Sequence, residues 1–211
     1  MTWLALLLLT GLFVGLHVVP FAPARRDRLV AAVGGEKPYM GLYAIASLVG
    51  LFGAFFAAGA APVVPLWYAG DGLRWAALVL TLPGFVLLAS AYVGTAGPRL
   101  ARHPMLAGIG LWALAHLLTN GELAHLLLFG ALALYAPAAM VASDRRDARR
   151  DPEAFAARAE ATALVPFAAL LRGGVGGLDW KGPAGGVVAW AVFLALHPWL
   201  FGVSPWPTAL F

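Results

Sequence analysis

Residues 104–142 read PMLAGIGLWALAHLLTNGELAHLLLFGALALYAPAAMVA and hold the clearest structural signal in the chain. Two apolar runs, 104–118 and 122–142, flank a short polar turn at 119–121. A helix needs about 20 apolar residues to cross the ~30 Å of hydrocarbon in a bilayer, so the second run is long enough and the first is somewhat short. Because the connection is so short, the sequence predicts a tight helical hairpin inside a membrane.

Four further apolar runs surround this hairpin, at residues 3–21, 40–61, 73–93 and 184–201. A basic cluster follows the first run instead of preceding it, which favours a retained helix over a cleaved signal peptide. Pro83 and Gly84 interrupt the third run and predict a kink there. The sequence therefore predicts an all-α integral membrane protein. About six transmembrane helices are expected to form a single transmembrane domain over residues 1–211.

The composition supports a membrane location and excludes several classes of function. Apolar residues make up 62% of the 211 residues and charged residues only 11%, whereas soluble domains have about 45–50% and about 25%. Cysteine is absent, which excludes disulfides, thiolate metal sites and cysteine nucleophiles. The charges lie in loops between the apolar runs, so the net charge of +4 indicates membrane topology and not a nucleic-acid surface. The predicted partner is the lipid bilayer.

The distribution of basic residues predicts the orientation in the membrane. With the N-terminus outside, 13 of the 14 Lys and Arg residues fall on the cytoplasmic side and only Arg74 on the other. This bias follows the positive-inside rule, and an odd number of helices would destroy it. Both termini are therefore predicted to be periplasmic. The outer interface would carry a belt of aromatic side chains, namely Trp3, Trp67, Tyr68, Trp199 and Trp206.

The segments between the apolar runs carry further predictions. Residues 144–160 are strongly charged and predict a solvated cytoplasmic helix. Residues 164–171 are apolar but too short to span, so they predict a short helix that lies at the interface or re-enters partway. The glycines between 173 and 186 predict a flexible connection into the last run. Small residues four positions apart predict close packing of helices, and two such pairs are Gly11 with Gly15 and Ala46 with Gly50.

Histidine is the main candidate for chemistry, because polar groups inside a membrane are costly and often functional. The chain holds five, His17, His103, His116, His125 and His197. Neutral imidazole is a natural metal ligand, and a haem iron can take one imidazole on each side. His125 and His197 lie near helix ends, where an imidazole often serves only as an interfacial side chain. The HExxH spacing of zinc hydrolases and a glycine-rich phosphate loop are both missing.

Longer motifs carry a family resemblance. Residues 102–108 read RHPMLAG and residues 111–122 read LWALAHLLTNGE. Together they resemble the signature of the NnrU family of bacterial membrane proteins, and the resemblance continues in GLH at 15–17 and HPWLFGV at 197–203. It covers essentially the whole chain and implies a location in the bacterial inner membrane. Its motif residues besides histidine are Arg102, Pro104, Trp112, Asn120 and Glu122.

The resemblance implies a cofactor and a class of substrate. The family is linked by name to nitrite and nitric oxide reduction in denitrification, and its plant relative is the 15-cis-ζ-carotene isomerase. That enzyme binds haem b, so the resemblance implies haem b and redox or isomerase activity on a lipophilic, carotenoid-like molecule. By motif, His17 and His116 would ligate the iron, and His103 would be a switching ligand or support one. The expected depth of His116 is about 20 Å from the inner boundary of the membrane, which does not match that of His17. The pairs His17 with His103 and His116 with His197 therefore remain alternative pairs of iron ligands.

Two other functions remain as alternatives. Arg102-His103-Pro104 followed by Gly108 also resembles the motif that helps isoprenylcysteine-type membrane methyltransferases bind S-adenosylmethionine. Residues 144–150 do not reproduce the second binding segment of those enzymes. The spans lack a convincing acid–base pair, which suits a non-enzymatic accessory or assembly factor. The sequence does not identify catalytic residues, the substrate or the oligomeric state.

Overall fold

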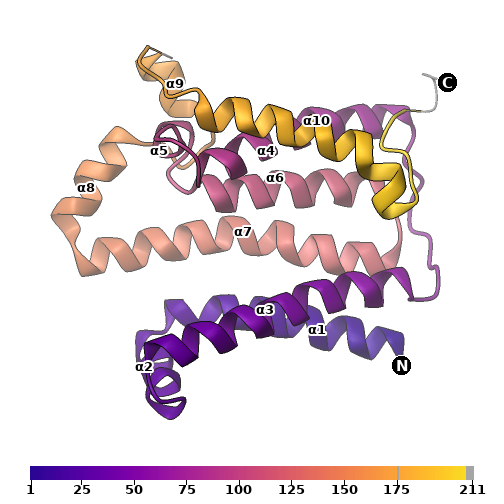
Figure 1. Ribbon diagram of the computed structural model, residues 1–211, viewed down its shortest axis with the longest axis horizontal. Helices are drawn as coiled ribbons and strands as arrows, with labels where there is room; N and C mark the ends of the chain where they lie inside the picture. Colours follow the sequence, from indigo (N-terminus) through magenta and orange to yellow (C-terminus); the bar gives the residue numbers. More distant parts are fainter. Residues whose placement is uncertain (175, 208–211) are drawn as a thin grey trace. The chain divides into compact units, whose positions relative to one another are not determined.

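The computed structural model describes residues 1–174 and 176–207, where the regular elements are helices (Figure 1). The chain forms two compact units. Unit 1 comprises Met1–Trp67 and Gly121–Leu132, and unit 2 comprises Tyr68–Asn120 and Ala133–Phe211. The helix that begins at Leu123 contributes residues to both units.

Unit 1 is built on two long apolar helices, α1 (Thr2–Val18) and α3 (Glu36–Gly59). Between them lie a 3-10 turn, η1 (Val19–Phe21), and the short polar helix α2 (Pro23–Ala32). Gly50 permits close packing of α3 on α1, because a Cβ there would lie 3.1 Å from the Phe13 main-chain nitrogen. The predicted pair Ala46 and Gly50 therefore packs through Gly50, whereas no atom lies within 4 Å of a Cβ built at Gly11 or Gly15.

The turn between α6 and α7 is held in unit 1 by an extended segment. The main-chain N–H groups of Leu66 and Trp67 donate to the Gly121 carbonyl at 2.7 and 3.1 Å, and the Leu123 N–H donates to the Val64 carbonyl at 2.9 Å. A Cβ at Gly121 would lie 1.9 Å from the Trp67 carbonyl oxygen, so a larger residue does not fit. The glycine of the Asn-Gly turn is therefore explained by close contact between two main chains.

Unit 2 contains three apolar helices that pack side by side, α4 (Asp71–Ser90), α6 (Pro104–Thr119) and α10 (Lys181–Phe201). Helix α4 packs against both others (Figure 1). The α4–α6 crossing is close, because a Cβ at Gly108 would lie 2.7 Å from the Gly84 carbonyl oxygen. Helix α4 continues through Pro83, so the helix is not interrupted at the predicted kink.

The glycines before the last span do not form a flexible connection throughout, so that prediction is wrong for residues 181–186. Helix α10 begins at Lys181, and Gly182 and Gly186 are buried within it. A Cβ at Gly186 would lie 2.5 Å from the Val86 Cα, and one at Gly182 would lie 2.6 Å from the Val93 carbonyl oxygen. These two glycines let α10 approach α4 closely, which is a packing role and not a linker role.

The predicted spans correspond to helices in the described residues. Five helices, α1 with η1, α3, α4, α7 (Leu123–Arg150) and α10, are long and apolar enough to cross a membrane, and α6 is a shorter apolar helix of 16 residues. The hairpin of α6 and α7 is confirmed within unit 2, where a Cβ at Gly110 would lie 3.2 Å from the Ala136 Cβ. The predicted all-α membrane bundle is therefore confirmed.

The charged segment 144–160 is not one solvated helix, so that prediction needs correction. Helix α7 continues to Arg150, and a second helix, α8, covers Pro152–Ala161. Asp151 separates them, because its carboxylate caps α8 by accepting from the Ala154 N–H at 3.0 Å. Asp144 is not solvated either, since its side chain is only 14% exposed.

The short apolar segment 164–171 is only partly helical. Helix α9 covers Ala168–Gly173. It packs against the four-residue helix α5 (Gly97–Leu100) at one end of unit 2 (Figure 1). Phe167 turns the chain with a left-handed backbone, φ 64°, and its N–H donates to the Leu100 carbonyl at 2.6 Å. Leu164, Phe167 and Leu170 pack against a buried core that includes Leu100.

Candidate functional site

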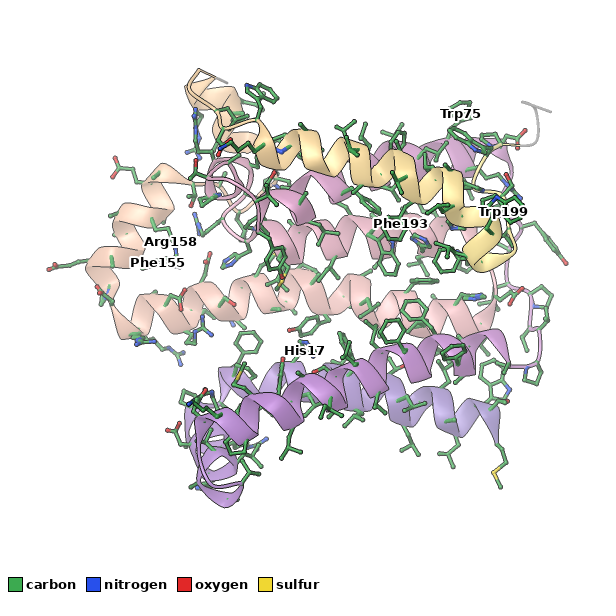
Figure 2. The ribbon with its side chains drawn as sticks, in the orientation of Figure 1. His17, Trp75, Phe155, Arg158, Phe193 and Trp199 are labelled. Carbon is green, nitrogen blue, oxygen red and sulfur yellow. The ribbon has the colours of Figure 1, made fainter. Side chains whose placement is uncertain are left out.

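His17 lies near the end of α1 in unit 1 and is held by its own helix (Figure 2). Its Nδ1–H donates to the Phe13 carbonyl, one turn earlier, at 2.7 Å. The imidazole also packs against two aromatic rings, with its centroid 4.2 Å from that of Phe13 and 5.3 Å from that of Tyr43 on α3. A carbonyl accepts only, so Nδ1 must carry the proton, and the electron pair of the neutral ring lies on Nε2.

His116 lies near the end of α6 in unit 2 and has the same arrangement. Its Nδ1–H donates to the Trp112 carbonyl at 2.8 Å, and its ring packs on the Trp112 indole at 4.4 Å. The main-chain carbonyl of His116 accepts from Asn120 twice, from the N–H at 2.9 Å and from the side-chain Nδ2 at 2.7 Å. Trp112 and Asn120 of the predicted motif therefore both hold His116.

This shared arrangement is the one that suits a metal ligand. Histidines that bind a metal through one nitrogen usually donate the other N–H to a carbonyl or carboxylate, which fixes the ring and its tautomer. Within residues 1–174 and 176–207, no group of three His, Asp or Glu side chains is placed to hold a metal ion. Haem iron takes only one or two axial ligands from the protein, so His17 and His116 each fit that role on their own helix.

His103 has a different environment. It precedes the first turn of α6, which starts at Pro104, and its Nε2 lies 2.8 Å from Oδ1 of Asp144 on α7. Asp144 Oδ2 accepts from Nη1 of Arg102 at 2.5 Å. The three side chains are nearly buried, with 12%, 13% and 14% exposure for Arg102, His103 and Asp144. One carboxylate therefore compensates the charge of Arg102 and accepts from His103.

Arg102 also joins α6 to the segment that follows α7. Its Nε donates to Thr162 Oγ1 at 3.0 Å, its Nη2 donates to the Ala159 carbonyl at 3.3 Å, and its main-chain N–H donates to the Ala163 carbonyl at 2.7 Å. Its guanidinium also lies 5.7 Å from the Phe155 ring, which extends from α8 (Figure 2). Arg102 thus connects α6 to α7, to α8 and to the segment after α8.

The comparison with protein families agrees with the sequence motifs. The model described as NnrU protein matches residues 5–205, which include both units. The chain belongs to the NnrU family. The predicted resemblance is therefore confirmed over nearly the whole chain. The comparisons with curated proteins and with solved structures gave no match.

Two further motif residues of this NnrU protein, Glu122 and His197, make contacts close to them in the sequence or with the segment before α4. Glu122 forms an isolated main-chain bridge with Pro65, and its Oε2 lies 3.4 Å from Nδ1 of His125. His197 on α10 donates its Nδ1–H to the Val203 carbonyl at 2.8 Å, so its neutral ring also has the electron pair on Nε2. His197 therefore stays an alternative ligand to His17 and His116.

Sequence reasoning missed Asp144 and Thr162 as partners of the Arg-His-Pro motif. Asp144 fell in the charged segment 144–160, which was predicted to be solvated, and Thr162 lay between that segment and the short apolar segment 164–171. The signal for Asp144 was the hairpin itself, because an antiparallel pair that turns at 119–121 brings residue 102 beside the first residues after the apolar part of α7. Thr162 had no comparable signal, since its place depends on the break between α7 and α8.

Proposed function

We propose that this NnrU-family membrane protein binds haem b, with His17 and His116 as the candidate iron ligands. The observation that supports the proposal is the Nδ1–H bond from each imidazole to a carbonyl of its own helix. When bound, haem would supply one-electron redox chemistry at its iron. We further propose that the activity is a redox or isomerase reaction on a lipophilic, carotenoid-like substrate, or serves nitric oxide metabolism in denitrification.

The described contacts would hold the two imidazole ligands in position, and they do not determine which reaction takes place. The Phe13 and Trp112 carbonyls hold the protonated Nδ1 atoms, and the neighbouring aromatic rings restrict rotation of the imidazoles. Apolar side chains dominate the exposed surface of the long helices, including Phe52, Phe56 and Val79. A lipophilic substrate could therefore reach the protein through the bilayer without a water-filled entrance.

The test is a visible spectrum of the protein purified in mild detergent after expression with added haem. We expect a sharp Soret band and split α and β bands on reduction, which indicate a six-coordinate haem. Single His17→Ala and His116→Ala variants should lose or shift these bands. His125→Ala is the matched control, because His125 is also a half-buried imidazole near a helix end but lies beside Glu122.

The spectra also separate the alternatives. Shifted bands in His103→Ala or His197→Ala, with wild-type bands in His17→Ala and His116→Ala, would contradict the ligand assignment. A featureless spectrum at full haem supply would contradict haem binding. An accessory role would then be tested by loss of a partner complex on deletion, and the methyltransferase alternative by calorimetric titration with S-adenosylmethionine.

The proposed orientation places both termini in the periplasm and the ends carrying α2, α5, α8 and α9 in the cytoplasm. The support is the location of 13 of the 14 basic residues in the predicted cytoplasmic loops. Because the chain has no cysteine, single cysteines report topology without background. We expect a membrane-impermeant maleimide to label Ser204→Cys and not Ala148→Cys in intact spheroplasts. The reverse pattern would contradict this orientation.

A further inference from the structure

Helices α5 and α9 lie at one end of unit 2 (Figure 1), and this end exposes apolar side chains. Val165 is 67% exposed, Leu171 89% and Trp180 58%. Their neighbours Leu164, Phe167 and Leu170 pack against the core. This end of unit 2 therefore has two sets of apolar residues, one packed inside the protein and the other exposed on its surface. Outward apolar residues on such a segment favour contact with the interfacial region of a bilayer.

Two arginines accompany these apolar residues, and neither has a carboxylate partner among the described residues. Arg99 on α5 donates to the carbonyls of Gly176 and Gly174 at 3.0 and 3.3 Å, and Arg172 on α9 donates to the Thr162 carbonyl at 3.2 Å. A carbonyl carries no net charge, so both guanidinium groups keep an uncompensated positive charge. Arg102 and Arg158 differ, because Asp144 and Asp147 compensate them.

Among the described residues of the loop before α10, Asp179 has the one carboxylate, and this carboxylate accepts hydrogen bonds from main-chain N–H groups. It accepts from the N–H groups of Thr95 at 3.0 Å and Lys181 at 3.1 Å. Asp179 carries one negative charge against the positive charges of Arg99, Arg172 and Lys181, so the sum of these four side chains is positive. Both arginines precede a span, Arg99 by five residues before Pro104 and Arg172 by nine residues before the start of α10 at Lys181. Trp180 directly precedes α10. Tryptophan at such a position is typical of the membrane interface.

We propose that the surface formed by Arg99, Val165, Leu171, Arg172 and Trp180, the α5–α9 patch, binds anionic phospholipid of the inner leaflet. The guanidinium groups contact the phosphate, and the apolar side chains enter the glycerol and upper acyl region. A dissolved anion would use only the arginines, so the exposed Val165, Leu171 and Trp180 favour a lipid. A guanidinium has five N–H donors and suits phosphate, and the carbonyl contacts occupy only two donors of Arg99 and one of Arg172.

The experiment measures lipid binding to the detergent-purified full chain by native mass spectrometry. The probes are phosphatidylglycerol and phosphatidylcholine with identical acyl chains. We expect the wild type to prefer phosphatidylglycerol, and the Arg99→Gln, Arg172→Gln double variant to lose about tenfold or more of that preference, since each basic residue near an anionic surface contributes about fivefold. Leu171→Ser should weaken binding of both lipids and keep the preference.

The matched control is Arg74→Gln. Arg74 also donates to a main-chain carbonyl, that of Trp206 at 3.3 Å, but it starts α4 at the opposite end of unit 2. We expect this variant to keep the wild-type preference. Equal binding of the two lipids by the wild type, or an unchanged preference in the double variant, would overturn the proposal. Displacement of phosphatidylglycerol by millimolar inorganic phosphate would also overturn it, because it would indicate a site for a dissolved anion. Each variant is accepted only if its thermal unfolding is cooperative.

Discussion

The imidazoles of His17 and His116 differ from that of His103 in what holds them. The first two each donate to a carbonyl one turn earlier in their own helix, and His17 also packs on Tyr43 of α3. His103 lies against Asp144, a carboxylate from another helix that also accepts from Arg102. The first arrangement fixes the tautomer and the orientation of the imidazole, and the second connects helices. His116 and His103 therefore show the same residue type held in two different ways.

The variant with the largest expected effect on this difference is Asp144→Asn. It leaves the nearly buried Arg102 without a compensating charge, which should cost about 3–5 kcal/mol in the free energy of unfolding. Thermal unfolding in detergent measures the effect. Replacing both charges, as Arg102→Met with Asp144→Leu, should cost clearly less, because no isolated charge remains.

The control for Asp144 is Asp147→Asn, which breaks an ion pair with the 41% exposed Arg158. A pair this exposed contributes about 0–1 kcal/mol. Equal losses of stability in Asp144→Asn and Asp147→Asn would contradict the role of Asp144 as the connection between α6 and α7. In every case the haem bands should keep their positions in folded protein, since His103 is not an assigned ligand.

A second test concerns the packing of α10 on α4 in unit 2. Gly186→Ala places a Cβ 2.5 Å from the Val86 Cα, and overpacking of this kind costs about 1–3 kcal/mol. The adjacent Gly185→Ala is the matched control, since no atom lies within 4 Å of a Cβ there. Both variants gain the same helix propensity, so the difference between their melting temperatures isolates the α4–α10 contact. A lower melting temperature in Gly185→Ala than in Gly186→Ala would contradict the packing described.

A smaller effect is expected from Asn120→Ala. It removes the Nδ2–H bond to the His116 carbonyl, which should cost about 1 kcal/mol and broaden the haem bands by loosening the end of α6. Thr10→Val is the control, because the buried Thr10 Oγ1 has no hydrogen-bond partner among the described residues. If Thr10→Val changed the bands and Asn120→Ala did not, the role of Asn120 in holding His116 would be wrong.

The smallest effect is a dependence of stability on pH. Hydrogen bonds from the main-chain N–H groups of Lys181 and Thr95 hold the pKa of Asp179 below its usual range. Its stabilising contribution is therefore present above the unfolded-state pKa of about 3.9 and is lost as the pH falls through the lower folded-state pKa. Unfolding curves from pH 6 down to pH 3 should show a steeper loss for the wild type than for Asp179→Asn. Parallel curves would contradict this contribution.

The sequence was sufficient for the spans because apolar length and charge placement depend on the bilayer and not on tertiary detail. It predicted the hairpin that turns at 119–121 and the shortness of α6. It failed at Gly182 and Gly186, because a glycine that permits close helix contact looks like one that permits flexibility. It also failed at Asp144, whose neighbours in the sequence are charged and exposed while its neighbours in space are Arg102 and His103.

The most direct test of the account is the haem content of the His17→Ala, His116→Ala double variant compared with the wild type, both expressed with added haem and purified alike. The account predicts that the wild type carries haem and that the double variant loses it while keeping cooperative unfolding. The His103→Ala variant should retain haem. An unchanged haem content per chain in the folded double variant would contradict the assignment of these two imidazoles as iron ligands.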